Sequence, residues 1–436
     1  MKILRSMMVP GTVMTRTLGW FVLLILLTLP GGCSENRCPP GQVAIGIEAD
    51  GRTPICSPWS ELPGFCQSCS DAHVVAEDSG GSTGDAGSDV PQRPAGSDAH
   101  VVAEDNDSSA GDAGGETPQR AAVLDPCRGK AVWVEQPITN PSGIDASWLM
   151  DVQVFSPVQA VAVGWDGTIA TWDGKTWELS STGTGDDLEG VWGTSSTALW
   201  AVSWFSTILS FGPDGWATSA ANTLNPMYDI RGTSGTSIWA VGLNATILRF
   251  DGTVWSFLPA SPKVNPLLDW VAVWPLDETH VWVAGWEHDV GSVIALWDGQ
   301  SLSPKLEQGP GGYEWWTSLW AADADAEYIF AAAASGAVYR SDSAGDTWAP
   351  MVSATKSRIW DIWGADADLV WAGTESGEIT LWDGHKWSLD GNVGEWISAI
   401  AGAGPELVIA VGGRWEDATS GYVPLIWRRV CSEPGE

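Results

Sequence analysis

A unit of about 41 residues recurs seven times along the C-terminal two-thirds of this 436-residue chain. It is clearest over residues 237–255, SIWAVGLNATILRFDGTVW, which reads as a strand, a turn, a second strand, an Asp-Gly turn and a third strand. Short β-rich runs with a period near two predict strands, and Asp251-Gly252 is typical of a two-residue hairpin turn, which needs positive φ angles. One unit cannot bury both of its faces, so repetition must build the fold.

Each unit carries a quartet of small and apolar residues in its second strand. The quartets occupy residues 161–164, 200–203, 239–242, 282–285, 330–333, 371–374 and 409–412. Eight residues earlier, at the expected end of the preceding strand, stand Gln153, Trp192, Arg231, Trp274, Ala322, Trp363 and Ala401. Asp-Gly turns follow in five units, at Asp173, Asp214, Asp251, Asp298 and Asp383. Four strands per unit of about 40 residues predict an all-β, seven-bladed β-propeller over residues 127–436, with most of its tryptophans packed between blades.

The two ends of the repeat region complement each other. The seventh unit stops after its third strand, at residues 423–430, while residues 130–135 look like the outer strand of other units. We therefore expect the N-terminal strand to complete the last blade. Cys127 and Cys431 then flank the place where other blades have an Asp-Gly turn, and we predict a disulfide between them. Closing a loop of about 300 residues stabilises the ring by up to about 5 kcal/mol in the chain-entropy model.

The N-terminus has the pattern of an export signal. Lys2, Arg5 and Arg16 precede an apolar run over residues 18–29, which is short for a membrane span but suits a signal peptide. The sequence LPGGC at residues 29–33 resembles a bacterial lipobox, although proline stands where that pattern prefers leucine. The resemblance implies a signal peptide over residues 1–32 and lipidation of Cys33. The alternative is an ordinary signal peptide with Cys33 in a disulfide, but seven cysteines leave an even set only without Cys33.

Two short regions separate the signal from the repeats. Residues 33–69 contain Cys38, Cys56, Cys66 and Cys69 among Pro and Gly, and two disulfides are expected with three connectivities open. A four-cysteine zinc site is the alternative, but only one Cys-x-x-Cys pair is present. Residues 70–126 hold a tandem duplication, with SDAHVVAED at 70–78 and again at 97–105. This acidic segment is too poor in apolar residues to order itself, and it predicts a disordered linker.

The net charge of −33 extends over the repeats as well as the linker. Such a surface repels phosphate backbones, so nucleic acid is not an expected partner. Solubility of an exported protein is the default explanation, with calcium or a cationic partner as alternatives. Calcium could use the pairs Asp323 with Asp325 and Asp366 with Asp368, but both pairs stand where polar turns are needed, and we predict turn chemistry and no cofactor or metal.

Two motifs indicate a family resemblance. Residues 341–348, SDSAGDTW, fit an Asp-box (BNR repeat) except that Ser343 replaces its aspartate. The commoner pattern here, WAVG followed by G-x-I and D-G-x-x-W, resembles the BNR-like and YVTN-like propeller repeats of exported bacterial lipoproteins. The resemblance covers residues 130–430 and implies the propeller fold. It implies no particular activity, since such propellers host unrelated functions.

The sequence predicts no enzyme. A sialidase-like glycoside hydrolase would share the Asp-box, but the Arg-Ile-Pro sequence of that family is absent and seven blades is the wrong number for it. His280, His288 and His385 show no metal-ligand spacing, and neither a Gly-x-Ser-x-Gly elbow nor a phosphate loop is present.

Candidate binding residues lie at one strand end and in two long loops. Arg231 replaces the tryptophan of other units near the channel, where it would either stack over a tryptophan or contact an anion at the channel mouth. The loops at residues 285–291 and 412–417 are longer than their counterparts and combine tryptophan with charge, a composition common in binding loops. Their candidate residues are Trp286, Glu287, His288, Arg414 and Trp415.

Together these features predict a non-catalytic binding or scaffold propeller that mediates protein–protein interaction at the cell envelope. It would be an outer-membrane lipoprotein, on the periplasmic face or at the cell surface, attached to the membrane through its lipid anchor only. The alternative is a carbohydrate-binding, lectin-like propeller for polysaccharide, and a sialidase-like hydrolase is the third hypothesis.

Overall fold

The computed structural model describes residues 42–47, 54–58, 123–127, 129–219, 223–259, 261, 263–287, 289–309, 313–322, 327–417 and 421–432. The chain divides into two compact units, residues 1–110 and 111–436. In the first, β1 (Gln42–Ile47) pairs antiparallel with β2 (Pro54–Pro58). The predictions for the signal peptide, for residues 70–122 of the linker, and for Cys33, Cys38, Cys66 and Cys69 fall outside the described residues, and of Cys56 only the backbone in β2 is described. The predicted end of the disordered linker is wrong, because residues 123–126 are described and Asp125 forms an ion pair with Arg429.

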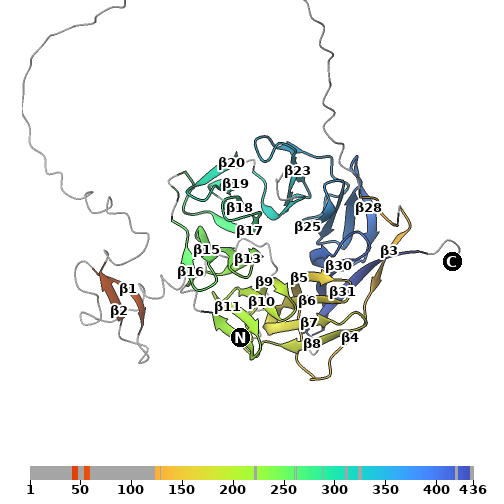
Figure 1. The fold of residues 1–436 in the computed structure, drawn as a ribbon, viewed down its shortest axis with the longest axis horizontal. Coiled ribbons are helices and arrows are strands. Elements are labelled where there is room, and N and C mark those ends of the chain that lie inside the picture. The colour runs from red at the N-terminus through yellow and green to blue at the C-terminus, as the bar shows by residue number, and fades with distance from the viewer. Residues whose placement is uncertain are drawn as a thin grey trace, which may run out of the picture. The chain divides into compact units, whose positions relative to one another are not determined.

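Seven antiparallel sheets form the second unit and follow one another around a ring (Figure 1). Blade 1 holds β5 (Leu149–Ser156), β6 (Gln159–Gly164), β7 (Thr168–Trp172) and β8 (Trp177–Ser181), with β4 (Ile138–Thr139) parallel to β8 and a 3-10 turn, η3 (Trp165–Gly167), between β6 and β7. Blade 2 holds β9 (Leu188–Ser195), β10 (Ala198–Ser203), β11 (Ile208–Gly212) and β12 (Gly215–Ser219). Blade 3 holds β13 (Met227–Ser234), β14 (Ser237–Gly242), β15 (Thr246–Phe250) and β16 (Trp255–Phe257). Blade 4 holds β17 (Asp269–Pro275), β18 (Val281–Glu287), β19 (Gly291–Trp297) and β20 (Leu302–Gln308).

The ring continues through three more blades. Blade 5 holds β21 (Trp316–Ala321), β22 (Ile329–Ala333), β23 (Val338–Ser341) and β24 (Ala349–Pro350). Blade 6 holds β25 (Ile359–Asp366), β26 (Leu369–Thr374), β27 (Glu378–Trp382) and β28 (Trp387–Asn392). Blade 7 holds β29 (Trp396–Gly402), β30 (Val408–Asp417), β31 (Gly421–Cys431) and β3 (Ala131–Glu135). The predicted all-β, seven-bladed β-propeller is confirmed.

Blade 7 closes the ring with strands from both ends of the repeat region. The N-terminal β3 pairs antiparallel with β31, from Ala131 opposite Cys431 to Glu135 opposite Trp427, as the sequence predicts. A disulfide joins Cys127 to Cys431 across this seam. Beside it, the fully buried guanidinium of Arg429 bonds to the carboxylates of Asp125 and Asp390 at 2.8 Å each.

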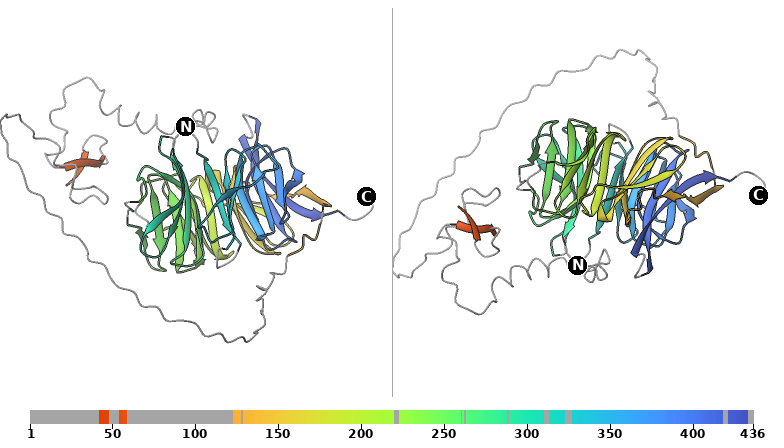
Figure 2. Two further views of the ribbon diagram at one scale, coloured as in Figure 1. Left: turned by 90° about the horizontal axis from the view of Figure 1, so that it is seen from above. Right: turned by 90° about the horizontal axis from the view of Figure 1, so that it is seen from below.

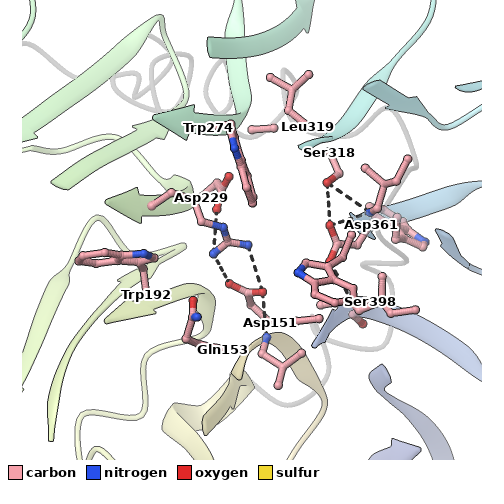
Figure 3. Close-up of a pocket in the computed structure, with 18 of the residues that line it drawn as sticks. Asp151, Gln153, Trp192, Asp229, Trp274, Ser318, Leu319, Asp361 and Ser398 are labelled. Atoms are coloured by element: carbon pink, nitrogen blue, oxygen red, sulfur yellow. Dashed lines mark hydrogen bonds and ion pairs between the residues drawn. The ribbon is translucent and has the colours of Figure 1, made fainter. Parts of the chain in front are cut away.

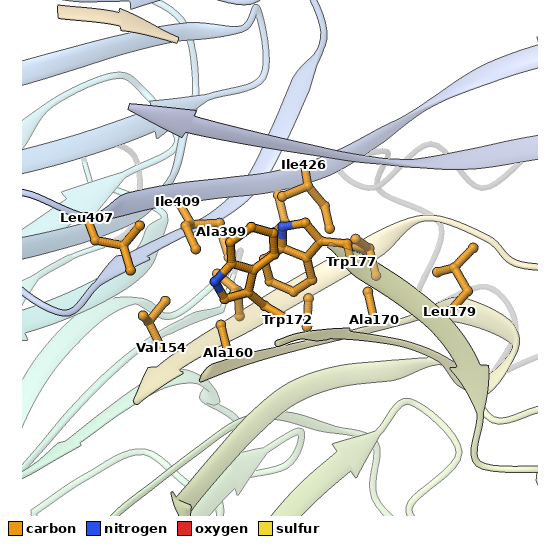
Figure 4. Close-up of a cluster of buried hydrophobic side chains, with 14 residues drawn as sticks. Val154, Ala160, Ala170, Trp172, Trp177, Leu179, Ala399, Leu407, Ile409 and Ile426 are labelled. Carbon is orange, nitrogen blue, oxygen red and sulfur yellow. The ribbon is translucent and has the colours of Figure 1, made fainter. Parts of the chain in front are cut away.

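The core lies between neighbouring blades. At the contact of blades 7 and 1, Trp172 and Trp177 pack at 5.6 Å between ring centroids, and Ile409 and Ile426 cover them (Figure 4). Six further clusters of this kind include buried tryptophans in most blades, among them Trp239, Trp270, Trp282 and Trp371. Truncating such a ring to alanine costs about 3–5 kcal/mol, so these tryptophans are committed to the fold.

Two details of register differ from the prediction. Trp320, not Ala322, pairs with the first quartet residue Phe330, because the turn of blade 5 is two residues longer than the spacing of eight assumes. The prediction of a two-residue turn at Asp251 is also wrong, since Phe250 pairs with Trp255 and four residues lie between them. Only Gly252 has a positive φ there, and the Asp251 carboxylate accepts the N–H groups two and three residues further on, at 2.8 and 2.9 Å.

Candidate binding site at the channel mouth

Each inner strand has a β-bulge at the same place, near its start. In blade 1, Leu149 pairs with Gly164 and Asp151 with Val163, so the residue between them is extra. The glycine is needed because a Cβ at Gly164 would lie 1.9 Å from the carbonyl oxygen of Trp148. The seven bulge residues all line one cavity in the centre of the ring: Met150, Glu189, Tyr228, Val271, Thr317, Trp360 and Ser398.

The cavity has a volume of about 250 Å³, and three aspartates directly after the bulges stand in its wall (Figure 3). Each carboxylate bonds to two backbone N–H groups, one in its own strand and one in the inner strand of a neighbouring blade. Asp151 accepts from Val152 and Val191, at 2.8 Å each. Asp229 accepts from Ile230 and Val273, and Asp361 accepts from Ile362 and Ile400, all at 2.8–2.9 Å. These carboxylates tie adjacent blades together.

Arg231 completes this network. Its guanidinium donates to Asp151 at 2.9 Å and lies 3.4 Å from Asp229, and it also donates to the carbonyl of Val191 at 3.0 Å. Burial lowers the pKa of Arg231, but Asp151 and Asp229 outweigh burial and hold the pKa above its ordinary value. Arg231 is thus paired with two carboxylates of the cavity wall, and no described tryptophan ring stacks on its guanidinium. The predicted contact with an anion stays a prediction.

The pKa of Asp361 shows how burial in this wall disfavours a charged carboxylate. Burial raises its pKa to about 6, helped by the charge of Asp151, although hydrogen bonds from Ser318 and Ile400 act in the opposite direction. The Ser318 hydroxyl donates to Asp361 at 2.6 Å. The pKa of Asp229 is raised as well, again chiefly by burial.

A different acid stands at the mouth of the cavity. Glu189, the bulge residue of β9, is half-buried, and burial with the neighbouring Asp187 raises its pKa to about 8, while a hydrogen bond with the Trp165 side chain opposes the shift. Tyr228 from β13 lies close enough for Glu189 to raise the pKa of its phenol, after burial and Asp269. The Tyr228 ring packs edge-on against Trp204 at 5.6 Å.

More aromatic side chains lie on the face of the propeller where this mouth opens. We call it the aromatic face: the inner strands begin there, and the turns between second and third strands lie there. Trp165 packs against Trp148 at 5.8 Å and Tyr422 at 5.3 Å. Trp360 stacks on Trp396 at 5.3 Å. Trp286 stacks on Trp315 with centroids 4.7 Å apart and planes within 3°.

The two long loops predicted as binding loops are extended hairpins instead. β18 and β19 pair as far as Glu287 with Gly291, and β30 and β31 pair as far as Asp417 with Gly421. Figure 2 shows β30 and β31 rising beyond the neighbouring strands. These hairpins belong to blades 4 and 7, so their candidate residues lie at separate points of the aromatic face.

The candidate residues in the hairpins have separate surroundings. Trp286 takes part in the stack with Trp315, and Trp415 is 52% exposed with its ring edge against Tyr422 at 4.9 Å. Arg414 pairs with Glu416 at 3.5 Å. Glu287 ends β18, and His288 lies outside the described residues.

The remaining sequence candidates have structural roles or lie outside the description. Asp366 accepts the N–H of Asp368 at 3.1 Å within a turn, and Asp323 and Asp325 are among the residues that the structure leaves undescribed. Across the described ranges, no group of three or more His, Cys, Asp or Glu side chains is placed to hold a metal ion. The described residues also include no helix of the length and apolarity that crossing a membrane requires.

Residues 341–348, which resemble an Asp-box, form a turn held by two serine hydroxyl groups. The Ser343 hydroxyl accepts the N–H of Thr347 at 2.9 Å, and the Ser341 hydroxyl accepts that of Gly345 at 2.8 Å. A Cβ at Gly345 would collide with the ring of Trp282. The motif thus shapes a turn, away from the channel mouth.

Comparison with known proteins establishes the class. The chain matches no protein-family model, and no curated protein matches its sequence. Among solved structures, it is similar to YCF48 bound to D1 peptide, with TM-score 0.51 and 16% identity over 70% of this chain and 97% of that one. For YCF48 from Cyanidioschyzon merolae the TM-score is 0.52 and the identity 15%, over 68% of this chain and 98% of that one. For the WD40 β-propeller domain of Doa1 the TM-score is 0.51 and the identity 13%, over 66% of this chain and 94% of that one. At such identities these likenesses establish the fold alone: the chain is a seven-bladed β-propeller protein.

Sequence reasoning missed the residues at the channel mouth. The aspartates in the wall had a signal, because Asp151, Asp229 and Asp361 each stand ten residues before a quartet. Glu189 had none, since its orientation depends on a bulge that the repeat pattern does not reveal.

Proposed function

We propose that this protein is a non-catalytic binding module that holds a polypeptide partner on the aromatic face of its propeller. One observation carries the proposal: half-exposed aromatic rings gather on the face of the propeller where the channel opens. They are Trp165, Trp204, Trp286, Trp315, Trp360, Trp396, Trp415 and Tyr422. Aromatic side chains are enriched at protein interfaces, where they supply large contact areas at low cost in conformational entropy.

The chemistry of the channel also favours binding over catalysis. A hydrolase needs carboxyl groups placed to attack or to transfer a proton to a substrate. In the cavity wall, Asp151, Asp229 and Asp361 already accept backbone N–H groups from two strands each. A similar propeller, YCF48, has been solved with a D1 peptide, which supports peptide binding as a use of this architecture.

A lectin-like function is the second candidate because Trp415 is 52% exposed and could stack on a sugar ring. A site in every blade would need a shared set of residues, but the residues that follow the quartets differ from blade to blade. They are Trp165, Trp204, Leu243, Trp286, Ala334, Glu375 and Gly413.

The same proposal places the protein at the cell envelope as a lipoprotein anchored through Cys33, with the acidic segment over residues 70–122 as a tether. The lipobox-like sequence and the odd number of cysteines support it. The mass of the mature N-terminus should show a lipid on the wild-type chain and none after Cys33→Ala. An unlipidated wild-type N-terminus would contradict this part.

Binding of the full chain to a random peptide library, and in parallel to a glycan and cell-wall polysaccharide panel, tests the function. We expect peptides to be enriched and to lose affinity for the Trp286→Ala, Trp415→Ala double variant. The control is Phe257→Ala, Leu389→Ala, which removes exposed apolar side chains from the outer strands. Glycan binding that the first variant loses would favour the lectin hypothesis, and peptide binding that only the control loses would contradict our choice of face.

A further inference from the structure

The starting point is the position of Glu189. The bulge of β9 turns this residue into the cavity mouth, where its carboxylate is half-buried. Among the residues that the structure describes, no lysine, arginine or histidine pairs with it. Arg231 lines the same cavity, but Asp151 and Asp229 already neutralise its charge. A carboxylate that is partly removed from water without a cation is costly unless something else supplies the charge.

The groups that face Glu189 add negative charge or none. Asp187 lies two residues earlier in the chain, and Asp269 acts on the neighbouring Tyr228, whose raised pKa keeps its phenol neutral. Burial and Asp187 raise the pKa of Glu189 to about 8. The groups described around Glu189 therefore supply it with no positive charge.

Aromatic rings form the walls around this carboxylate. Trp165 bonds to Glu189 from the blade 1 side, and Tyr228 stands on the blade 3 side with Trp204 packed against it at 5.6 Å. The walls are held in place: the N–H of Asp166 donates to the Asp187 carboxylate at 3.0 Å, and the N–H of Trp204 donates to the Asp187 carbonyl at 2.9 Å. Aromatic faces attract cations, by about 2 kcal/mol when the site is desolvated.

Size limits the guest. A cavity of about 250 Å³ is smaller than a typical pocket for a drug-sized molecule and accommodates one long side chain. A neutral guest would leave Glu189 unpaired, and an anion would be repelled by Glu189 and Asp187. An alkylammonium or guanidinium group would pair with the carboxylate and contact the rings at once.

We infer that the channel mouth holds one lysine or arginine side chain of the polypeptide partner, between Glu189 and the rings of Trp165, Trp204 and Tyr228. This inference rests on the proposed function, because it names the part of the partner that the aromatic face recognises. A positively charged partner is also consistent with the net charge of −33.

The probes are peptides selected from the random library on the full chain. Each is remade with one lysine replaced by acetyl-lysine or one arginine by citrulline, which keeps the length of the side chain and removes its charge. We expect one such change to weaken binding about tenfold or more. Glu189→Gln should cause a similar loss, and combining the two changes should add little, as for groups that act on each other. Glu395→Gln, on the same face, is the matched control and should leave affinity unchanged.

A pH profile gives a second readout. Since the pKa of Glu189 is about 8, its ionised fraction rises from about 0.1 at pH 7 to about 0.9 at pH 9, while lysine stays charged. Affinity for the cationic peptide should therefore rise about tenfold over this range in the wild type and stay flat in Glu189→Gln, whose unfolding curve shows that it still folds.

Each result separates the two proposals. Peptides that bind the aromatic face equally well after neutralisation, or that bind Glu189→Gln as tightly as the wild type, would overturn the cation site and leave the proposed function intact. A library that yields no peptide dependent on the aromatic face would overturn both.

Discussion

Acidic side chains stand at two places in the centre of this propeller, and the two places differ in the groups that bond to the carboxylates. In the cavity wall, Asp151 accepts two backbone N–H groups and pairs with Arg231, so its charge is balanced inside the protein. At the mouth, the Trp165 side chain is the described polar partner of Glu189, and another acid, Asp187, lies nearby. The acids that recur at one position in three blades tie the ring together, whereas Glu189 has no such role, and for this reason we infer that it serves a ligand.

A third group of buried charges lies at the seam of blade 7, where we expect a substitution to change the free energy of unfolding most. The Arg429 guanidinium is 2% exposed and balances Asp125 and Asp390. Arg429→Met would leave two carboxylates without their cation, and we expect it to lower the free energy of unfolding by about 4 kcal/mol in a denaturant titration. Arg414→Met, which removes a half-exposed pair with Glu416, should change it by less than about 0.5 kcal/mol. Equal effects of the two changes would show that the seam cluster is not a buried ion network.

A substitution in the cavity wall should have the second-largest effect on the free energy of unfolding. Arg231→Met leaves Asp151 and Asp229 facing each other across the cavity wall, and we expect a loss of about 3 kcal/mol, less than at the seam because Arg231 is 19% exposed. The loss measured in denaturant should shrink as the pH falls and the Asp229 carboxyl, whose pKa is raised by burial, becomes protonated. A loss that does not depend on pH would contradict the assigned pairing.

At the mouth, the free energy of unfolding should depend on pH because Glu189 lacks a cation in the fold. The pKa of Glu189 rises from 4.5 in the unfolded chain to about 8 in the fold, so the folded state binds more protons between these values. Its contribution to stability is therefore lost as the pH rises from about 5 to 8. After allowance for the solvent that reaches this half-buried group, we expect the wild type to lose about 1–3 kcal/mol more than Glu189→Gln over that range. Parallel pH profiles would show that Glu189 is not desolvated.

The smallest effect on stability should come from the exposed ring of Trp415. Its edge contact with Tyr422 is its one described packing partner among the aromatic rings. Trp415→Ala should change the free energy of unfolding by about 0.5 kcal/mol or less, yet weaken partner binding. A large loss of stability would make this tryptophan part of the core.

The blade number and the closing strand could be predicted because they depend on local patterns. The quartets and turn aspartates mark each blade, and Cys127 and Cys431 stand where a turn is missing. Register inside a blade was less secure, since one longer turn shifted the inner position of blade 5 from Ala322 to Trp320.

The site could be predicted only in part, because it depends on how distant strands meet. Arg231 was recognised as unusual, but its partner Asp151 is 80 residues away, and only the ring brings them together. Trp286 and Trp415 were identified from loop composition, and the structure places them in different blades. Glu189 sits in a bulge, where a strict alternation of inward and outward side chains fails.

The most direct test of the account is one chemical change made at both places: carboxylate to amide at Asp151 and at Glu189, with unfolding free energies measured side by side at pH 7. We expect Asp151→Asn to lose about 2–3 kcal/mol, because an amide offers one acceptor oxygen where two are used and gives Arg231 no charge. Glu189→Gln should leave the protein as stable as the wild type, or more stable. A loss at Glu189 that equals the loss at Asp151 would make both acids structural and would contradict a mouth reserved for a cationic partner.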